Sequence, residues 1–152
     1  RIVDDLARQL SGPADLVVVF ATPDHRERFR MIHDHLANAL APQVEIGITA
    51  EGVIGIRHEL ERRAGLSVLA AQLPGAILRP FSYEQIDWPG VIDQPADLRQ
   101  AVTTAEPDEL LRAILLLADP FSAPMVKLLP NLTVALPGVP VIMTSPGARV
   151  TA

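Results

Sequence analysis

The stretch "DLVVVFATPDHRERFRMIHDHLANALAPQVEIGITA" (15–50) decides the fold, because a strand, a helix and a second strand follow one another within it. Its opening, "DLVVVFAT" (15–22), is a β-branched apolar run, which is typical of a buried strand. Its end, "VEIGITA" (44–50), is also predicted to be a strand. Because the connections are short, the two strands are predicted to be parallel and joined by a right-handed crossover, as in a βαβ unit.

The crossover segment predicts an amphipathic helix over residues 24–40. Apolar residues recur in it at helical spacing, namely Phe29, Ile32, Leu36, Ala39 and Leu40. Asp24 is predicted to be the N-cap, where its negative charge suits the positive end of the helix dipole. Pro42 is expected to end the helix.

The same order of elements returns near the other end of the chain. "AILLLAD" (113–119) predicts a strand, residues 121–136 predict a helix capped by Ser122, and "VPVIMT" (139–144) predicts a second strand. The two halves are therefore interpreted as a pseudo-repeat, although any two βαβ units share this spacing.

The segment between the two predicted βαβ units has a different sequence pattern. Two apolar runs flank Pro74 and Gly75 over residues 65–83, which predicts an antiparallel hairpin. Residues 84–107 are predicted to form a long loop, anchored by Trp88, with a short helix near residues 96–101. The predicted fold class is α/β, with two βαβ units forming a mixed sheet around a central antiparallel hairpin and helices packed on the sheet.

The composition limits the possible functions. The 152 residues are 49% hydrophobic and 20% charged, which suits one folded domain. The net charge of −5 argues against nucleic acid as a partner, because phosphate binding needs a basic stripe. The absence of cysteine excludes disulfides, thiolate zinc sites and cysteine nucleophiles. No apolar run approaches the roughly 20 residues that membrane insertion requires.

We expect a single domain over residues 1–152 that is a fragment of a longer chain, because the sequence opens on Arg1 rather than methionine. The lack of cysteine and of a visible signal peptide fits the cytoplasm, which is the localisation we expect.

The glycines of "GITAEGVIG" (47–55) raise the question of a phosphate-binding loop. The gap between Gly47 and Gly52 suits a P-loop, but Val53 and Ile54 stand where the motif needs lysine and Ser/Thr. The dinucleotide fingerprint G-x-G-x-x-G is also incomplete. The segment is therefore predicted to be a turn after the strand, in which Gly52 adopts positive φ.

The carboxyl ends of the parallel strands form the candidate site, because ligands of open sheets lie beyond those ends. The candidate ligand-binding residues are Thr22, Asp24, Thr49, Glu51, Gly52, Asp119, Ser122 and Thr144. Carboxylates beside helix N-termini, which favour anions, predict a site for a small zwitterion. The alternative is that Asp119 and Ser122 only cap a helix and that Glu51 points to water.

The metal-binding and catalytic motifs that the sequence suggests are incomplete. "RHELER" (57–62) lacks the second histidine of H-E-x-x-H and predicts a strand with one charged face instead. His33 and His35 point to different faces of the predicted helix, and His33 is expected to be a partly buried structural residue. We therefore expect no metal site. Because the sequence also lacks a G-x-S-x-G nucleophile elbow, we expect no catalysis. An enzyme that uses Glu51 with Glu59 or Asp119 stays as an alternative that needs a raised pKa.

Several ordered motifs resemble one known family, the FIST (F-box and intracellular signal transduction) N-terminal domain. "GITAEGVIGIRHELERRAGLSVLAAQLPGAILRPF" (47–81) is similar to its pattern G-C-S-A-E-G-x-I-G, E-x-E, apolar strand, L-P-G and P-F. "DPFSAP" (119–124) and "LPGVPVI" (136–142) also resemble it. Ile48 and Thr49 replace the cysteine and serine of the family pattern, and Pro130 interrupts the second predicted helix.

The resemblance implies a sensory domain of a signal-transduction protein that binds a small molecule, such as an amino acid or a related compound. The implied partners are this ligand, a C-terminal FIST half and signalling output domains, with no cofactor. The main alternative is a protein–protein interaction module that docks onto the C-terminal half. A less favoured alternative is a haem-based gas sensor that uses His25, His33, His35 or His58.

Overall fold

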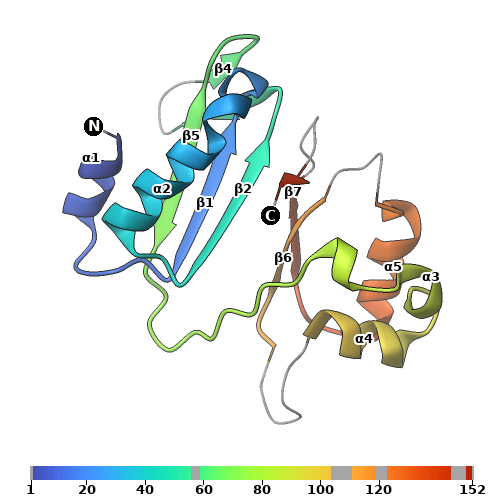
Figure 1. Ribbon diagram of the computed structural model, residues 1–152. Coiled ribbons are helices and arrows are strands. Elements are labelled where there is room, and N and C mark those ends of the chain that lie inside the picture. Colours follow the sequence, from blue (N-terminus) through green and yellow to red (C-terminus); the bar gives the residue numbers. More distant parts are fainter. Residues whose placement is uncertain (1, 56–58, 104–110, 119–122, 145–149, 152) are drawn as a thin grey trace. The chain divides into compact units, whose positions relative to one another are not determined.

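The computed structural model describes residues 2–55, 59–103, 111–118, 123–144 and 150–151 (Figure 1). Contacts divide the chain into two compact units: the first comprises Arg1–Leu78 with Pro146–Ala152, and the second comprises Arg79–Ser145. Each unit combines helices with a small sheet, so the α/β fold class is confirmed. That the two units make a single domain stays a prediction.

The first unit is built on a mixed sheet with the strand order β5-β1-β2-β8. Strand β1 (Leu16–Ala21) pairs in parallel with β2 (Val44–Thr49), which confirms the first βαβ unit. On its other side β1 pairs antiparallel with β5 (Leu66–Ala71). The short β8 (Val150–Thr151) pairs antiparallel with β2. Strand β1 therefore has a paired neighbour on both sides, as its apolar sequence predicts.

The helix predicted over residues 24–40 begins as a 3-10 turn, η1 (Pro23–Arg28), and continues as α2 (Phe29–Leu40). It ends at Ala41, which adopts the left-handed conformation with φ 42° immediately before Pro42. Together with α1 (Ile2–Gln9), this helix buries an apolar cluster against the sheet. The fully buried members of this cluster are Ala14, Val17, Val19, Leu36 and Leu40.

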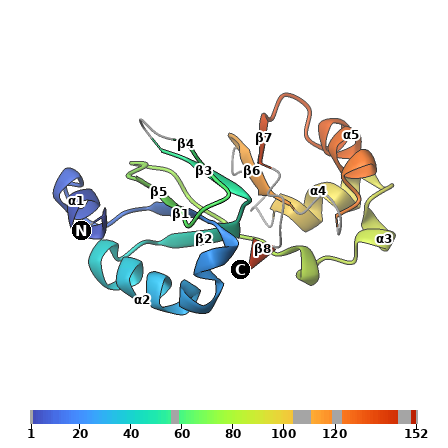
Figure 2. The same ribbon diagram turned by 90° about the horizontal axis from the view of Figure 1, so that it is seen from above.

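An antiparallel hairpin is present in the first unit, but at a different place from the predicted one. It is formed by β3 (Gly52–Ile54) and β4 (Glu59–Glu61), and Figure 2 shows it on the face of the sheet opposite α2. The predicted turn at Pro74–Gly75 does form, with Gly75 at φ 78° and a hydrogen bond from Ala76 N to Leu73 O. However, residues 76–82 form no strand, because β5 takes β1 as its partner and Pro80 has no N–H to donate.

The second unit contains the other predicted βαβ unit. Strands β6 (Ile114–Leu117) and β7 (Val141–Thr144) pair in parallel, and α5 (Met125–Ala135) lies between them in the chain. The prediction that both units share one mixed sheet is not met in the described residues, where β6 and β7 form a two-stranded sheet of their own.

The segment predicted as a long loop over residues 84–107 is largely helical. After η2 (Tyr83–Gln85) come α3 (Trp88–Val91) and α4 (Pro95–Thr103), and the latter confirms the short helix expected near residues 96–101. The loop prediction is wrong for this part because Trp88, Leu98 and Val102 are buried, and this burial stabilises the helices. Residues 104–107 lie outside the described residues.

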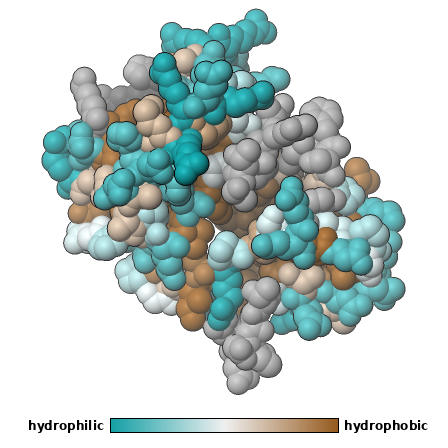
Figure 3. Space-filling model, viewed as in Figure 1, coloured by the Kyte–Doolittle hydropathy of each residue, from teal (hydrophilic) through white to brown (hydrophobic). Residues whose placement is uncertain are grey.

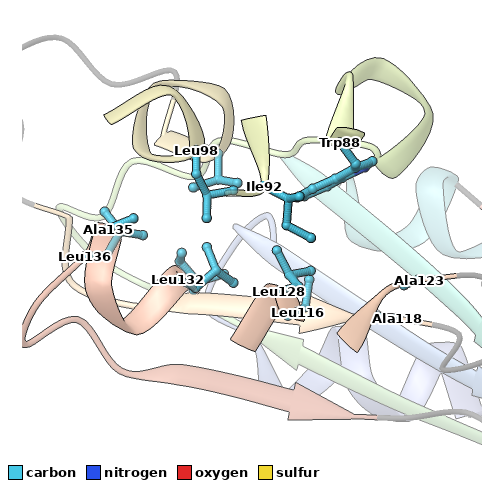
Figure 4. Packing of buried hydrophobic residues seen from close by; sticks show 12 residues of the cluster. Trp88, Ile92, Leu98, Leu116, Ala118, Ala123, Leu128, Leu132, Ala135 and Leu136 are labelled. Carbon is cyan, nitrogen blue, oxygen red and sulfur yellow. The ribbon is translucent and has the colours of Figure 1, made fainter. Parts of the chain in front are cut away.

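These helices complete the core of the second unit. Figure 4 shows Trp88, Ile92 and Leu98 facing Leu128 and Leu132 of α5. The inner face of β6, with Ile114 and Leu116, belongs to the same cluster. Trp88 therefore anchors a core rather than a solvated connector.

Candidate functional site

The candidate site in the first unit lies at the carboxyl ends of β1 and β2. These parallel strands end side by side, with Ala21 opposite Thr49, and Ala50 N donates a hydrogen bond to Ala21 O over 2.9 Å. Thr22 and Asp24 follow the end of β1, and Glu51 follows the end of β2. The predicted edge thus exists for this pair of strands.

Thr22 is a buried polar residue, with only 1% of its surface exposed. Its Oγ1 accepts a hydrogen bond from Gly65 N over 2.9 Å and donates one to Asp24 Oδ2 over 3.0 Å. Its own N–H donates to Gly65 O over 2.9 Å. Three hydrogen bonds therefore fix Thr22 between the end of β1 and the start of β5.

Asp24 is exposed, and its role differs from the predicted N-cap. The residue before η1 is Thr22, and its side chain makes no capping hydrogen bond. Asp24 lies within η1, and its Oδ2 accepts from the Thr22 hydroxyl instead of from a helix N–H. Pro23, which has no N–H, occupies the first helical position, where an N–H would have no partner within the helix.

Glu51 and Gly52 form the bend between β2 and β3. Glu51 is exposed, so its carboxylate is available to solvent or to a ligand. The prediction of positive φ at Gly52 is wrong, because among the described glycines only Gly75 and Gly138 have positive φ. Gly52 instead opens β3 opposite Glu61, and a Cβ there would lie 3.1 Å from Leu60 O. Glycine at this position therefore allows the close approach of β3 to β4.

Thr49 is buried at the end of β2, directly opposite Ala21. In the second unit, Thr144 ends β7 opposite Leu117, so it occupies the predicted strand end. Asp119 and Ser122 lie outside the described residues. The convergence of all eight candidates on one site therefore stays a prediction.

The histidines of α2 differ from expectation. His33 is 59% exposed rather than partly buried, and its Nδ1 lies 3.1 Å from Oε2 of Glu45 on β2. The distance suits an ion pair, but Oε2 makes no hydrogen bond of acceptable geometry. His35 Nδ1 lies 2.8 Å from Met31 O of the same helix. No group of three or more His, Cys, Asp or Glu suitable for a metal occurs in the described part of the chain.

Sequence reasoning missed two residues that shape this unit. Gly65 carries no local motif, and its partner Thr22 is 43 positions away in the chain. The sequence patterns assign no role to Glu45, but its side chain lies on the α2 side of the sheet beside His33. The charged strand predicted over residues 57–62 is confirmed for Glu59–Glu61, where both glutamates are exposed and Leu60 is half-buried.

The sequence motifs agree with a comparison against known families. The family model of the FIST N domain matches residues 15–142. The chain belongs to the FIST N domain family. This FIST N domain is thereby associated with signalling proteins, and the match runs from the start of β1 to the first half of β7. No curated protein and no solved structure matches the chain. No helix among its described residues is long and apolar enough to cross a membrane.

Proposed function

We propose that this FIST N domain is a sensory domain that binds a small molecule, such as an amino acid or a related amine-bearing compound. The proposed site in the first unit consists of Thr22, Asp24, Thr49, Glu51 and Gly52. The observation that carries the proposal is the shared carboxyl end of β1 and β2, where two exposed carboxylates follow paired parallel strands. In this proposal the domain acts in the cytoplasm and passes its signal to attached output domains.

The chemistry of this edge suits a ligand with an ammonium group. Asp24 uses Oδ2 for the Thr22 hydroxyl, and within the described residues its Oδ1 makes no hydrogen bond. An ionised carboxylate is a strong acceptor for N⁺–H donors, so Asp24 and Glu51 favour a cationic group over a neutral one. Hydrophilic side chains also cover much of the surface over η1 and α2 on the face seen in Figure 3.

We propose binding rather than catalysis as the role of these residues. The sequence carries no nucleophile–base motif, and the carboxylates Asp24 and Glu51 are both exposed. A carboxylate that works as a general acid at neutral pH needs an environment that raises its pKa, such as burial beside apolar groups. Exposure supports a recognition role instead.

A thermal-shift screen against amino acids and related amines tests the proposal. A ligand present at 100 times its Kd stabilises the folded state by about 2.7 kcal/mol, which is measurable as a rise in Tm. We expect Glu51→Gln and Asp24→Asn to reduce or abolish the rise. The matched control is Glu27→Gln, because Glu27 is an exposed carboxylate on the same 3-10 turn. A screen without any shift, or equal loss in the control, contradicts the proposal.

A second candidate function is docking onto a C-terminal FIST half without a small ligand. The observation that favours it is apolar exposure in the second unit: Val126 on α5 is 92% exposed, and Val134 and Ile142 are also largely exposed. Such residues mark protein interfaces when they gather on one surface. Co-expression with the C-terminal half distinguishes this function, since Val126→Lys then weakens the complex without changing the Tm of the domain alone.

A further inference from the structure

Three groups at the end of β1 form a continuous chain of hydrogen bonds. Gly65 N donates to Thr22 Oγ1 over 2.9 Å, and Thr22 Oγ1 donates to Asp24 Oδ2 over 3.0 Å. One end of the chain is a buried backbone amide, and the other end is an exposed carboxylate. The middle residue, Thr22, is almost fully buried.

The direction of this hydrogen-bond chain is fixed by the chemistry of its members. A backbone N–H only donates, and an ionised carboxylate only accepts, so the Thr22 hydroxyl must accept from Gly65 and donate to Asp24. Hydrogen bonds in series polarise one another, and a charged acceptor strengthens the whole series. The charge on Asp24 therefore strengthens the bond at the Gly65 amide.

Gly65 is also a junction between the strands and the β3–β4 hairpin. Its carbonyl accepts from Thr22 N, which continues the pairing of β1 with β5. A Cβ on Gly65 would lie 2.6 Å from Val53 Cγ2, so the hairpin packs directly on this residue. Ser67 Oγ of β5 donates to Ile54 O of β3 over 2.9 Å, which fixes the same hairpin a second time.

We propose that Thr22 is a positioning residue that couples the charge of Asp24 to the packing of the β3–β4 hairpin on Gly65. A cationic group that pairs with Asp24 withdraws charge from the Thr22 hydroxyl and weakens the bond from Gly65. The hairpin follows Glu51 directly in the chain, so the coupling joins the two carboxylates of the proposed site. The coupling itself is a property of the free domain; only its use by a ligand rests on the proposed function.

Hydrogen exchange and NMR of the Gly65 amide test the coupling without any ligand. In Asp24→Asn the acceptor of the Thr22 hydroxyl loses its charge, so that hydroxyl is less polarised as an acceptor, and we expect the Gly65 amide to exchange about twofold faster. The Gly65 amide proton is expected to shift upfield. Asp24→Ala, which removes the acceptor, is expected to have a larger effect, and Thr22→Ser, which keeps the hydroxyl, a smaller one.

Glu27→Gln is the matched control, because it removes the same charge from η1 without touching Thr22. The coupling is overturned if Gly65 is unchanged in Asp24→Asn, or if Glu27→Gln changes it equally. Its failure is distinguishable from that of the proposed function. A positive ligand screen with a silent Gly65 amide rejects the coupling alone, and a flat screen with a responsive Gly65 amide rejects ligand binding alone.

Discussion

At the scale of single residues, Gly65, immediately before β5, and Gly47, within β2, differ in whether the structure leaves room for a Cβ. Neither has positive φ, so neither is required by backbone conformation. At Gly65 a Cβ would collide with Val53 and approach Leu60 Cδ1 to 3.3 Å. At Gly47, in the middle of β2, a Cβ would meet no atom within 4 Å. The two positions therefore differ in the space that is available for a Cβ.

The comparison predicts opposite outcomes for two alanine substitutions. We expect Gly65→Ala to lower the free energy of unfolding by about 1–3 kcal/mol, since overpacking forces the hairpin away from β5. Gly47→Ala is expected to be neutral or slightly stabilising, because alanine loses less backbone entropy on folding. Urea unfolding of both variants measures the difference. Equal effects at the two sites contradict the account of Gly65 as a close-packed junction.

Local sequence patterns predict the contacts of single residues less well than they predict helices and strands. Asp24 is a reasonable N-cap by its neighbours, but the capping position depends on how the chain leaves β1. Positive φ at Gly52 is likewise reasonable for a turn, yet the neighbouring strand β4 decides its conformation. The Thr22–Gly65 bonds join residues 43 positions apart, and no local pattern encodes such a pairing. Site details therefore depend on tertiary contacts.

At the scale of elements, α5 contains a proline in its interior. Pro130 is exposed and lies at the middle of Met125–Ala135. Because proline has no N–H, it leaves the carbonyl of Val126 without its i+4 donor. Val126 is strongly exposed, so water is available to its backbone. The helix forms despite Pro130 because Leu128 and Leu132 are buried in the core of the second unit.

Pro130→Ala is therefore expected to stabilise the protein. Restoring the helix hydrogen bond adds up to about 3 kcal/mol, and the greater freedom of the unfolded chain subtracts about 1 kcal/mol. A net gain of roughly 1–2 kcal/mol follows from these two figures. Pro95→Ala is the control, because Pro95 begins α4, where proline is favourable. Loss of stability in Pro130→Ala indicates instead that the ring itself packs in the native state.

The sequence predicts best those elements that have a strong local periodicity of apolar residues. Strands β1, β2, β6 and β7 and the two crossover helices lie where apolar runs and helical spacing place them. Helix α3 is missed because Pro89 and Gly90 are typical of loops, whereas α4, which begins at Pro95, confirms the short helix predicted near residues 96–101. The partner of β5 was also missed, since strand pairing is a choice among distant segments.

At the scale of the whole molecule, each unit has an apolar cluster of its own. Leu36 is fully buried in the cluster of the first unit, and Leu132 is buried in that of the second. The chain has one tryptophan, Trp88, and it belongs to the second cluster. Tryptophan fluorescence therefore reports on the second unit, whereas far-UV circular dichroism reports on both.

This difference allows the two clusters to be probed separately. Leu36→Ala is expected to destabilise the first unit by about 2–5 kcal/mol, as for other buried leucines. We expect the urea transition seen by circular dichroism to broaden or divide, while the Trp88 fluorescence midpoint moves little. Leu132→Ala is the control, and it should move the fluorescence midpoint. Equal movement of that midpoint in both variants contradicts separate unfolding of the units.

Helix α1 bears on how this protein is best produced in shortened form. The family match begins at residue 15, whereas α1 ends at Gln9 and therefore falls outside it. Even so, Val3, Leu6, Ala7 and Leu10 pack against the cluster that contains Leu36 and Leu40. An expression boundary drawn at the start of the matched segment would remove α1 from this cluster and expose its apolar residues to solvent, so we expect the shortened protein to aggregate.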